Sequence, residues 1–130
     1  MTHLTFKKTI LILLHAFVVW ALCGATMGIG LAVLGEQKAL IVHAVGAPVF
    51  AALVSLFYYR KLNYTSPMQT ALIFLLFVVV MDAGLVAPVF VKSYDMFLSA
   101  LGTWIPFVLI FSSTYLTGIF VKRNKTLPDE

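Results

Sequence analysis

Asp82 is the residue whose type and position point most directly to chemistry. It is the only charged residue in an apolar stretch, residues 68–91, and lies near the middle of it. An aspartate at mid-membrane costs roughly 2.5–3.5 kcal/mol on insertion scales, so such residues are usually paired or functional. Burial without a partner favours the protonated acid. A carboxyl group that exchanges a proton at this depth suits a proton-coupled transporter. The alternative is a neutral acid that joins helices through hydrogen bonds.

Two histidines in other apolar stretches are further candidates for carrying a proton or binding a substrate. His43 lies about one helical turn inside a membrane boundary, and a helix tilt or kink can bring it to Asp82 as a proton relay. Alternatively, His43 is a polar group at that boundary. His15 lies in the opposite half of the membrane, at about the depth of Ser112 and Ser113. These hydroxyls either line an inner vestibule with His15 or form structural hydrogen bonds between helices.

No metal, haem or other cofactor is predicted. His15 and His43 fall in opposite halves of antiparallel helices, which is incompatible with bis-histidine haem ligation within one chain. The sequence has no HxxxH or carboxylate cluster, no Walker loop and no dinucleotide-binding glycine pattern. The single cysteine, Cys23, cannot form an internal disulfide. The connections are too short for an enzyme domain, so any active site has to lie within the membrane.

Prolines inside the apolar stretches predict that one half of the molecule is irregular. Pro48, Pro88 and Pro106 each remove a backbone donor and release the carbonyl four residues earlier. All three fall in the predicted outer half, where such carbonyls can line a cavity together with Trp104. The alternative is that each proline makes only a packing kink.

A GxxxG pattern from Gly24 to Gly28 predicts a helix-packing face, which Ala32 extends at the same spacing. His15 lies nine residues before Gly24, which is about 180° around a helix. If both faces need protein neighbours, a second copy in a homodimer or another membrane protein must cover one of them. Alternatively, the glycines pack within the chain and a neutral His15 lies at a lipid-facing edge.

Four apolar stretches must position these residues, and each is long enough to cross a membrane. They are residues 9–34, 39–59, 68–91 and 96–121. At about 1.5 Å per residue, each clears a hydrocarbon core of about 30 Å. The short connections favour antiparallel hairpins, the first stretch with the second and the third with the fourth. The sequence therefore predicts an all-α polytopic membrane protein in which residues 1–130 form one antiparallel four-transmembrane-helix bundle.

Composition and charge agree with this architecture. Hydrophobic residues make up 62 % of the chain and charged residues 11 %, against about half and about a quarter in soluble domains. Of nine Lys and Arg residues, seven lie in the N-terminal segment, the middle connection and the C-terminal tail. The positive-inside rule then places both termini in the cytoplasm, with the chain in the cytoplasmic (inner) membrane. The charges suit anionic lipid headgroups, and no basic aromatic face for nucleic acid is present.

These patterns lead to one leading expectation of function and two alternatives. We expect a small cytoplasmic-membrane transporter or permeation protein that is proton-coupled through Asp82. One alternative is a structural or accessory subunit of a larger membrane complex. The other is an intramembrane redox or lipid-modifying enzyme, although the sequence favours a role without catalysis. The expected partners are membrane lipids and either a second copy of the chain or another membrane protein.

Overall fold

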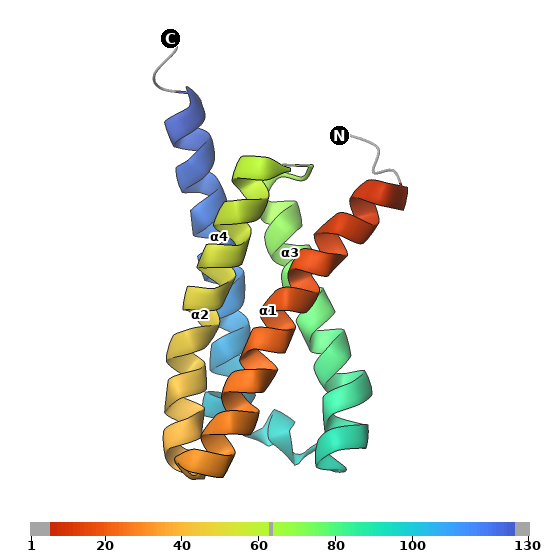
Figure 1. Ribbon diagram of the computed structural model, residues 1–130, viewed down its shortest axis with the longest axis vertical. Coiled ribbons are helices and arrows are strands. Elements are labelled where there is room, and N and C mark those ends of the chain that lie inside the picture. The colour runs from red at the N-terminus through yellow and green to blue at the C-terminus, as the bar shows by residue number, and fades with distance from the viewer. Residues whose placement is uncertain (1–5, 63, 127–130) are drawn as a thin grey trace.

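The computed structural model describes residues 6–62 and 64–126, and every regular element in that part of the chain is a helix. The long helices are α1 (Phe6–Val33), α2 (Glu36–Lys61), α3 (Pro67–Met81) and α4 (Ile105–Thr126). Three shorter elements join α3 to α4 (Figure 1), namely η1 (Asp82–Val91), η2 (Asp95–Leu98) and η3 (Ala100–Trp104). The prediction of an all-α chain is confirmed for the described residues.

Four segments of the described chain are long and apolar enough to cross a membrane. They are Phe6–Val33, Glu36–Lys61, Pro67–Val91 and Ala100–Lys122. The first three agree with the predicted stretches to within a few residues. The fourth begins at Ala100 rather than at residue 96, because Asp95–Leu98 forms a separate 3₁₀ turn and the backbone at Ser99 is extended.

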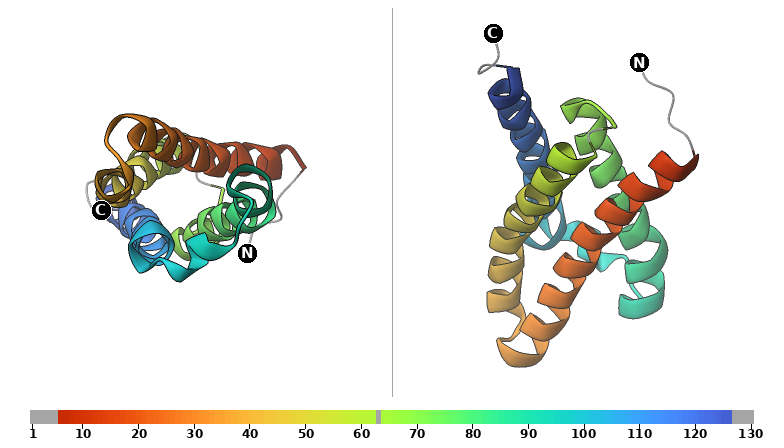
Figure 2. Two further views of the ribbon diagram at one scale, coloured as in Figure 1. Left: turned by 90° about the horizontal axis from the view of Figure 1, so that it is seen from below. Right: turned by 45° about the horizontal axis from the view of Figure 1, so that its top comes forward.

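The long helices contact one another in the cyclic order α1, α2, α4, α3 (Figure 2, left). Thus α1 contacts α2 and α3 contacts α4, as the short connections predict. The start of α1, the α2–α3 connection and the end of α4 lie together, and we call this the terminal end (Figure 1). The α1–α2 connection, η2 and the last turns of η1 lie at the opposite end, which we call the distal end.

Local sequence explains where several elements begin and end. Before α3, the Ser66 hydroxyl accepts a hydrogen bond from the Gln69 backbone N–H at 3.2 Å, and the Ser66 N–H donates to Gln69 Oε1 at 3.1 Å. This capping box, followed by Pro67 in the first turn, is a strong helix start. Gly35, with φ of 85°, separates α1 from α2, and Lys92, with φ of 62°, ends η1.

Buried hydroxyl groups hold the terminal end together. The Tyr58 hydroxyl shares a 2.7 Å hydrogen bond with Thr65 Oγ1 and accepts one from the Tyr64 N–H at 3.2 Å. Thr65 Oγ1 also lies 2.6 Å from Thr70 Oγ1, which in turn donates to the Ser66 carbonyl at 2.8 Å. Each of these polar groups is therefore satisfied within the chain.

Tyr59 fixes α2 against α4 at the same end. Its buried hydroxyl donates to the Thr114 carbonyl at 3.0 Å. The ring lies against Gly118, where an added Cβ would be 2.6 Å from Tyr59 Cζ and 2.7 Å from Pro67 Cβ. Only glycine fits at this crossing, because a methyl group would overlap two buried neighbours.

The distal end departs from α-helical winding. η1 is a π-helix that starts at Asp82 and contains Pro88, and η3 is a second, shorter π-helix. By contrast, α2 remains α-helical through Pro48. Pro106 is the second residue of α4 and directly follows η3, whose winding runs on into α4 because the Ile105 N–H donates to the Ala100 carbonyl. Irregular backbone is thus found around Pro88 and just before Pro106, and not at Pro48.

Candidate binding cavity

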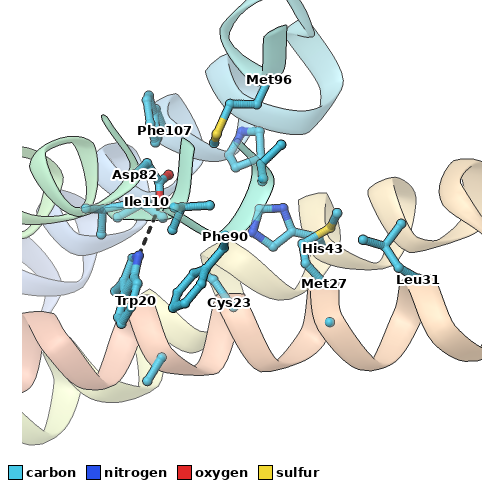
Figure 3. Close-up of a pocket in the computed structure, with 17 residues that line it drawn as sticks. Trp20, Cys23, Met27, Leu31, His43, Asp82, Phe90, Met96, Phe107 and Ile110 are labelled. Atoms are coloured by element: carbon cyan, nitrogen blue, oxygen red, sulfur yellow. Dashed lines mark hydrogen bonds between the residues drawn. The ribbon is translucent and has the colours of Figure 1, made fainter. Parts of the chain in front are cut away.

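A cavity of about 650 Å³ lies between α1, η1 and the first turns of α4 (Figure 3). All of its lining side chains are apolar or aromatic except for Asp82, His43 and the weakly polar Cys23. Asp82 is the only formally charged lining residue in the described chain, and neither Lys nor Arg reaches the cavity wall. The site is therefore a mainly apolar space that contains one carboxyl group and one imidazole.

Asp82 is held by a single hydrogen bond from α1. The Trp20 indole Nε1 donates to Asp82 Oδ1 at 3.1 Å, as the dashed line in Figure 3 shows. Asp82 is the first residue of η1, so the backbone changes from α to π winding at the carboxyl-bearing residue. The carboxyl group keeps unused hydrogen-bonding capacity, because one indole donor does not saturate two oxygens.

His43 lies elsewhere along the same cavity. It is 9 % exposed, and its Nδ1 has no hydrogen-bond partner among the described residues. Figure 3 shows the imidazole apart from the Asp82 carboxyl group, and no hydrogen bond joins the two within the described chain. The sequence led us to expect either contact with Asp82 or a boundary position for His43. The structure brings both residues to one cavity without that contact.

The cavity has a closed side and an open rim. Val78 and Ile110, which line it near Asp82, are buried in the core of the molecule. Leu31, Phe90 and Val91 line it near the distal end and are 48 %, 66 % and 52 % exposed. A molecule that enters at this rim therefore meets apolar side chains first and the carboxyl group deeper inside.

His15 and Ser113 lie outside the cavity lining. His15 Nδ1 donates to the Leu11 carbonyl at 2.8 Å, and its ring packs against Tyr58 at a centroid distance of 5.6 Å. Ser113 Oγ donates to the Pro48 carbonyl at 2.7 Å and so links α4 to α2. For Ser113, the interhelical hydrogen bond that we considered as an alternative is what the structure contains.

Of the other residues predicted to line a cavity, one does so and the rest do not. Pro106 lines the cavity, whereas Pro48, Pro88 and Ser112 are not among the lining residues. Trp104 is half exposed, and its Nε1 donates to the Phe97 carbonyl at 2.7 Å, which closes the η2–η3 segment on itself. The structure therefore brings together Asp82, His43 and Pro106 from the predicted set.

The GxxxG residues are not packed against another helix of the described chain. Gly24 and Gly28 border the cavity, and an added Cβ at either would have no neighbour within 4 Å among the described residues. The close helix contacts use other glycines. At Gly30, an added Cβ would lie 3.0 Å from Ala39 Cβ on α2. The alternative in which the seam packs internally therefore does not describe this chain.

Trp20 is the site residue that sequence reasoning missed. A signal was present, because Trp20 and Asp82 lie at similar depths in stretches that run in the same direction. An indole N–H in an apolar environment requires an acceptor, and Asp82 was the only carboxylate at that depth. The pairing could thus have been proposed from the two depths alone.

Comparison with known proteins does not add an assignment. No family model, curated protein or solved structure matches the chain. Within the described residues, no three His, Cys, Asp or Glu side chains lie close enough together to hold a metal ion. What the findings define is an all-helical protein with four segments capable of crossing a membrane and a cavity that contains a carboxyl group.

Proposed function

We propose that this protein is a four-helix, multi-pass protein of the cytoplasmic membrane that acts as a small transporter or permeation protein, with Asp82 as its protonatable centre. The observation that carries the proposal is that Asp82 lines a cavity and is not sealed in a helix contact. An ionisable side chain in an apolar space is costly to keep there. It is therefore a default candidate for proton exchange or ligand binding.

Surface composition supports a membrane location. Large apolar side chains are exposed along all four long segments, including Ile29, Leu53, Val80 and Val108. An apolar surface of this extent is unfavourable in water and is typical of a surface that contacts lipid or another protein. Most Lys and Arg residues of the described chain lie at the terminal end. By the positive-inside rule, this supports a cytoplasmic location for that end.

The cavity suggests how transport would proceed. Its rim opens near the distal end, while Val78 and Ile110 close it toward the terminal end, where the buried rings of Tyr58 and Phe74 follow. A substrate or proton reaching Asp82 from the distal side meets this packed core. Transport then requires a rearrangement that opens the core side and closes the rim, as in alternating access. Proton exchange at Asp82, with or without help from His43, supplies the charge change that biases such a rearrangement.

Proton flux through reconstituted protein tests the proposal. Liposomes containing the wild-type chain and a trapped pH-sensitive dye should acidify or alkalinise when a membrane potential is imposed. Asp82→Asn should reduce this flux at least roughly tenfold, because the amide cannot exchange a proton. Asp95→Asn is the matched control, since Asp95 is exposed and does not line the cavity. Flux that is absent in wild type, or equal in the two variants, contradicts the proposal.

One observation favours a second candidate, an accessory subunit of a larger membrane complex. Gly24 and Gly28 present an exposed small-residue face with open space beside it. Such a face suits close approach by another helix. Purification in mild detergent separates the two candidates. A stable complex with a different protein supports the accessory role, and a homodimer supports the transporter.

A further inference from the structure

We propose that the cavity binds a lipophilic cation, a molecule whose positive charge is embedded in an apolar body, such as a quaternary ammonium or phosphonium ion. This inference rests on the proposed function, because it names the substrate class of the same Asp82 site.

The charge of the site is the first argument. Asp82 is the only charged lining residue in the described chain, and its one hydrogen-bond donor is the neutral Trp20 indole. A carboxylate in an apolar space needs either a proton or a positive partner. The lining contains no Lys or Arg to serve as that partner. A bound cation supplies the charge that the protein omits.

The scarcity of oxygen ligands determines what kind of cation fits. Metal cations such as Ca²⁺ take about six to eight oxygen ligands, and Mg²⁺ also keeps a full coordination shell. Here the lining side chains offer one carboxyl group, from Asp82. A strongly hydrated ion would lose its water shell without replacement. An organic cation with apolar substituents has little hydration to lose, so it matches a site of this composition.

The walls of the cavity match the apolar body of such a cation. Trp20, Phe90 and Phe107 supply aromatic rings, and aromatic faces attract cations. Met27 and Met96 add flexible, polarisable thioethers that adapt to varied shapes. The volume of about 650 Å³ lies within the usual range for sites of drug-sized ligands.

The route of entry favours a membrane-soluble molecule. The rim residues Leu31, Phe90 and Val91 are exposed and apolar, so a ligand with an apolar body can pass over them from the lipid phase. The carboxyl group lies deeper, beside the buried Val78. The site therefore selects first for apolar character and then for positive charge.

Binding should weaken as the pH falls. The titratable groups that line the cavity are Asp82 of η1, Cys23 of α1 and His43 of α2, and the lining residues of α3, η2 and α4 add none. Protonation of Asp82 removes the attracting charge, and protonation of His43 adds a repelling one. Both changes act in the same direction, so a bound cation and a bound proton compete.

Two ions of the same shape and opposite charge test the inference on the wild-type protein. Tetraphenylphosphonium and tetraphenylborate are measured by equilibrium binding to the purified full chain in detergent, over a range of pH. We expect roughly tenfold or greater preference for the phosphonium ion near neutral pH, decreasing in acid, because only the cation gains the carboxylate attraction. Equal binding of the two ions, no binding of either, or a preference that does not change with pH overturns the inference.

Variants sharpen this result. Asp82→Asn should weaken phosphonium binding at least roughly tenfold and leave borate binding little changed, because it removes charge while keeping size. Asp95→Asn should bind both ions as wild type does. If Asp82→Asn does not fold, Phe90→Ala replaces it: Phe90 is 66 % exposed and outside the packed core, and its loss should weaken phosphonium binding severalfold. Phosphonium affinity that neither variant changes contradicts the inference.

The outcome is separable from that of the transport proposal. Cation binding without phosphonium uptake or proton flux in liposomes supports a cation site and rejects transport. Proton flux that depends on Asp82, without charge preference in binding, keeps transport and rejects the lipophilic cation.

Discussion

The terminal and distal ends of the molecule differ in how far their buried polar groups are satisfied. At the terminal end, the hydroxyls of Tyr58, Thr65 and Thr70 bond to one another and to the backbone, and Thr114 Oγ1 is the exception, with no partner among the described residues. In the distal cavity, Asp82 has one donor, and the Nδ1 of His43 has no partner among the described residues. An unsatisfied buried group costs about 1–3 kcal/mol.

The backbone follows the same division. The helices at the terminal end are regular and packed closely enough that Gly118 has no room for a methyl group. Toward the distal end, the chain changes to π winding at Asp82 and passes through η2 and η3 before α4 begins. The terminal end therefore holds the fold together, while the distal end keeps an open cavity and a buried polar atom without a partner in the described chain.

The largest effect on stability is expected at Gly118. Gly118→Ala would place a methyl carbon 2.6 Å from Tyr59 Cζ and should lower the free energy of unfolding by about 1–3 kcal/mol through overpacking. Gly24→Ala is the matched control, because open space surrounds that position, and it should be neutral or slightly stabilising. SDS-induced unfolding in mixed micelles measures both. Equal stability of the two variants would show that the terminal end is not tightly packed.

The hydroxyl network should give the next effect. Tyr58→Phe removes the group shared with Thr65 and accepting from the Tyr64 N–H, so it should cost about 1–2 kcal/mol of unfolding free energy. Tyr94→Phe is the control, since Tyr94 is exposed in the distal connection. A loss for Tyr58→Phe no greater than for Tyr94→Phe would break the contrast between the two ends.

A smaller effect is expected where α4 meets α2. Ser113→Ala removes the hydrogen bond to the Pro48 carbonyl and should cost about 0.6 kcal/mol, the average for polar contacts between membrane helices. Ser112→Ala should change stability less, because no hydrogen bond of its hydroxyl is found in the described chain. The same unfolding assay checks the pair, and the reverse order would contradict the interhelical role of Ser113.

The smallest change in stability is expected in the cavity. His43→Leu removes a buried imidazole whose Nδ1 has no partner, so unfolding free energy should stay within about 0.5 kcal/mol of wild type or rise. The same variant should alter the pH dependence of proton flux. A loss above about 1 kcal/mol would mean that His43 is a structural residue like those of the terminal end.

Sequence alone was sufficient to predict the four long apolar segments and the presence of a carboxyl group inside the third. Apolar length predicted the helices, and the cost of a charge in residues 68–91 singled out Asp82. The start of the fourth segment was wrong by a few residues, because the break at Ser99 depends on local backbone geometry without a strong sequence signal.

The details of the site were harder to predict because they depend on packing between distant segments. The π winding from Asp82 to Val91 has no periodic signature in a fully apolar stretch. Which glycines mediate close contacts also depends on helix rotation. The GxxxG pattern indicated Gly24 and Gly28, whereas the tight positions include Gly30, Gly102 and Gly118. His43 and Asp82 share a cavity without touching, a relation that depth alone does not distinguish from contact.

Carbodiimide labelling tests the central claim, that Asp82 is a protonatable carboxyl group open to an apolar cavity. Dicyclohexylcarbodiimide partitions into apolar sites and reacts with protonated carboxylic acids. We predict one dominant adduct at Asp82, located by mass spectrometry, that decreases as the pH is raised and when tetraphenylphosphonium is present. Glu36 at the start of α2 and Asp95 at the start of η2 are exposed and lie outside the cavity lining, so a reagent that concentrates in apolar sites should leave them unlabelled. An unlabelled Asp82, or labelling confined to Asp95 and Glu36, would contradict the account.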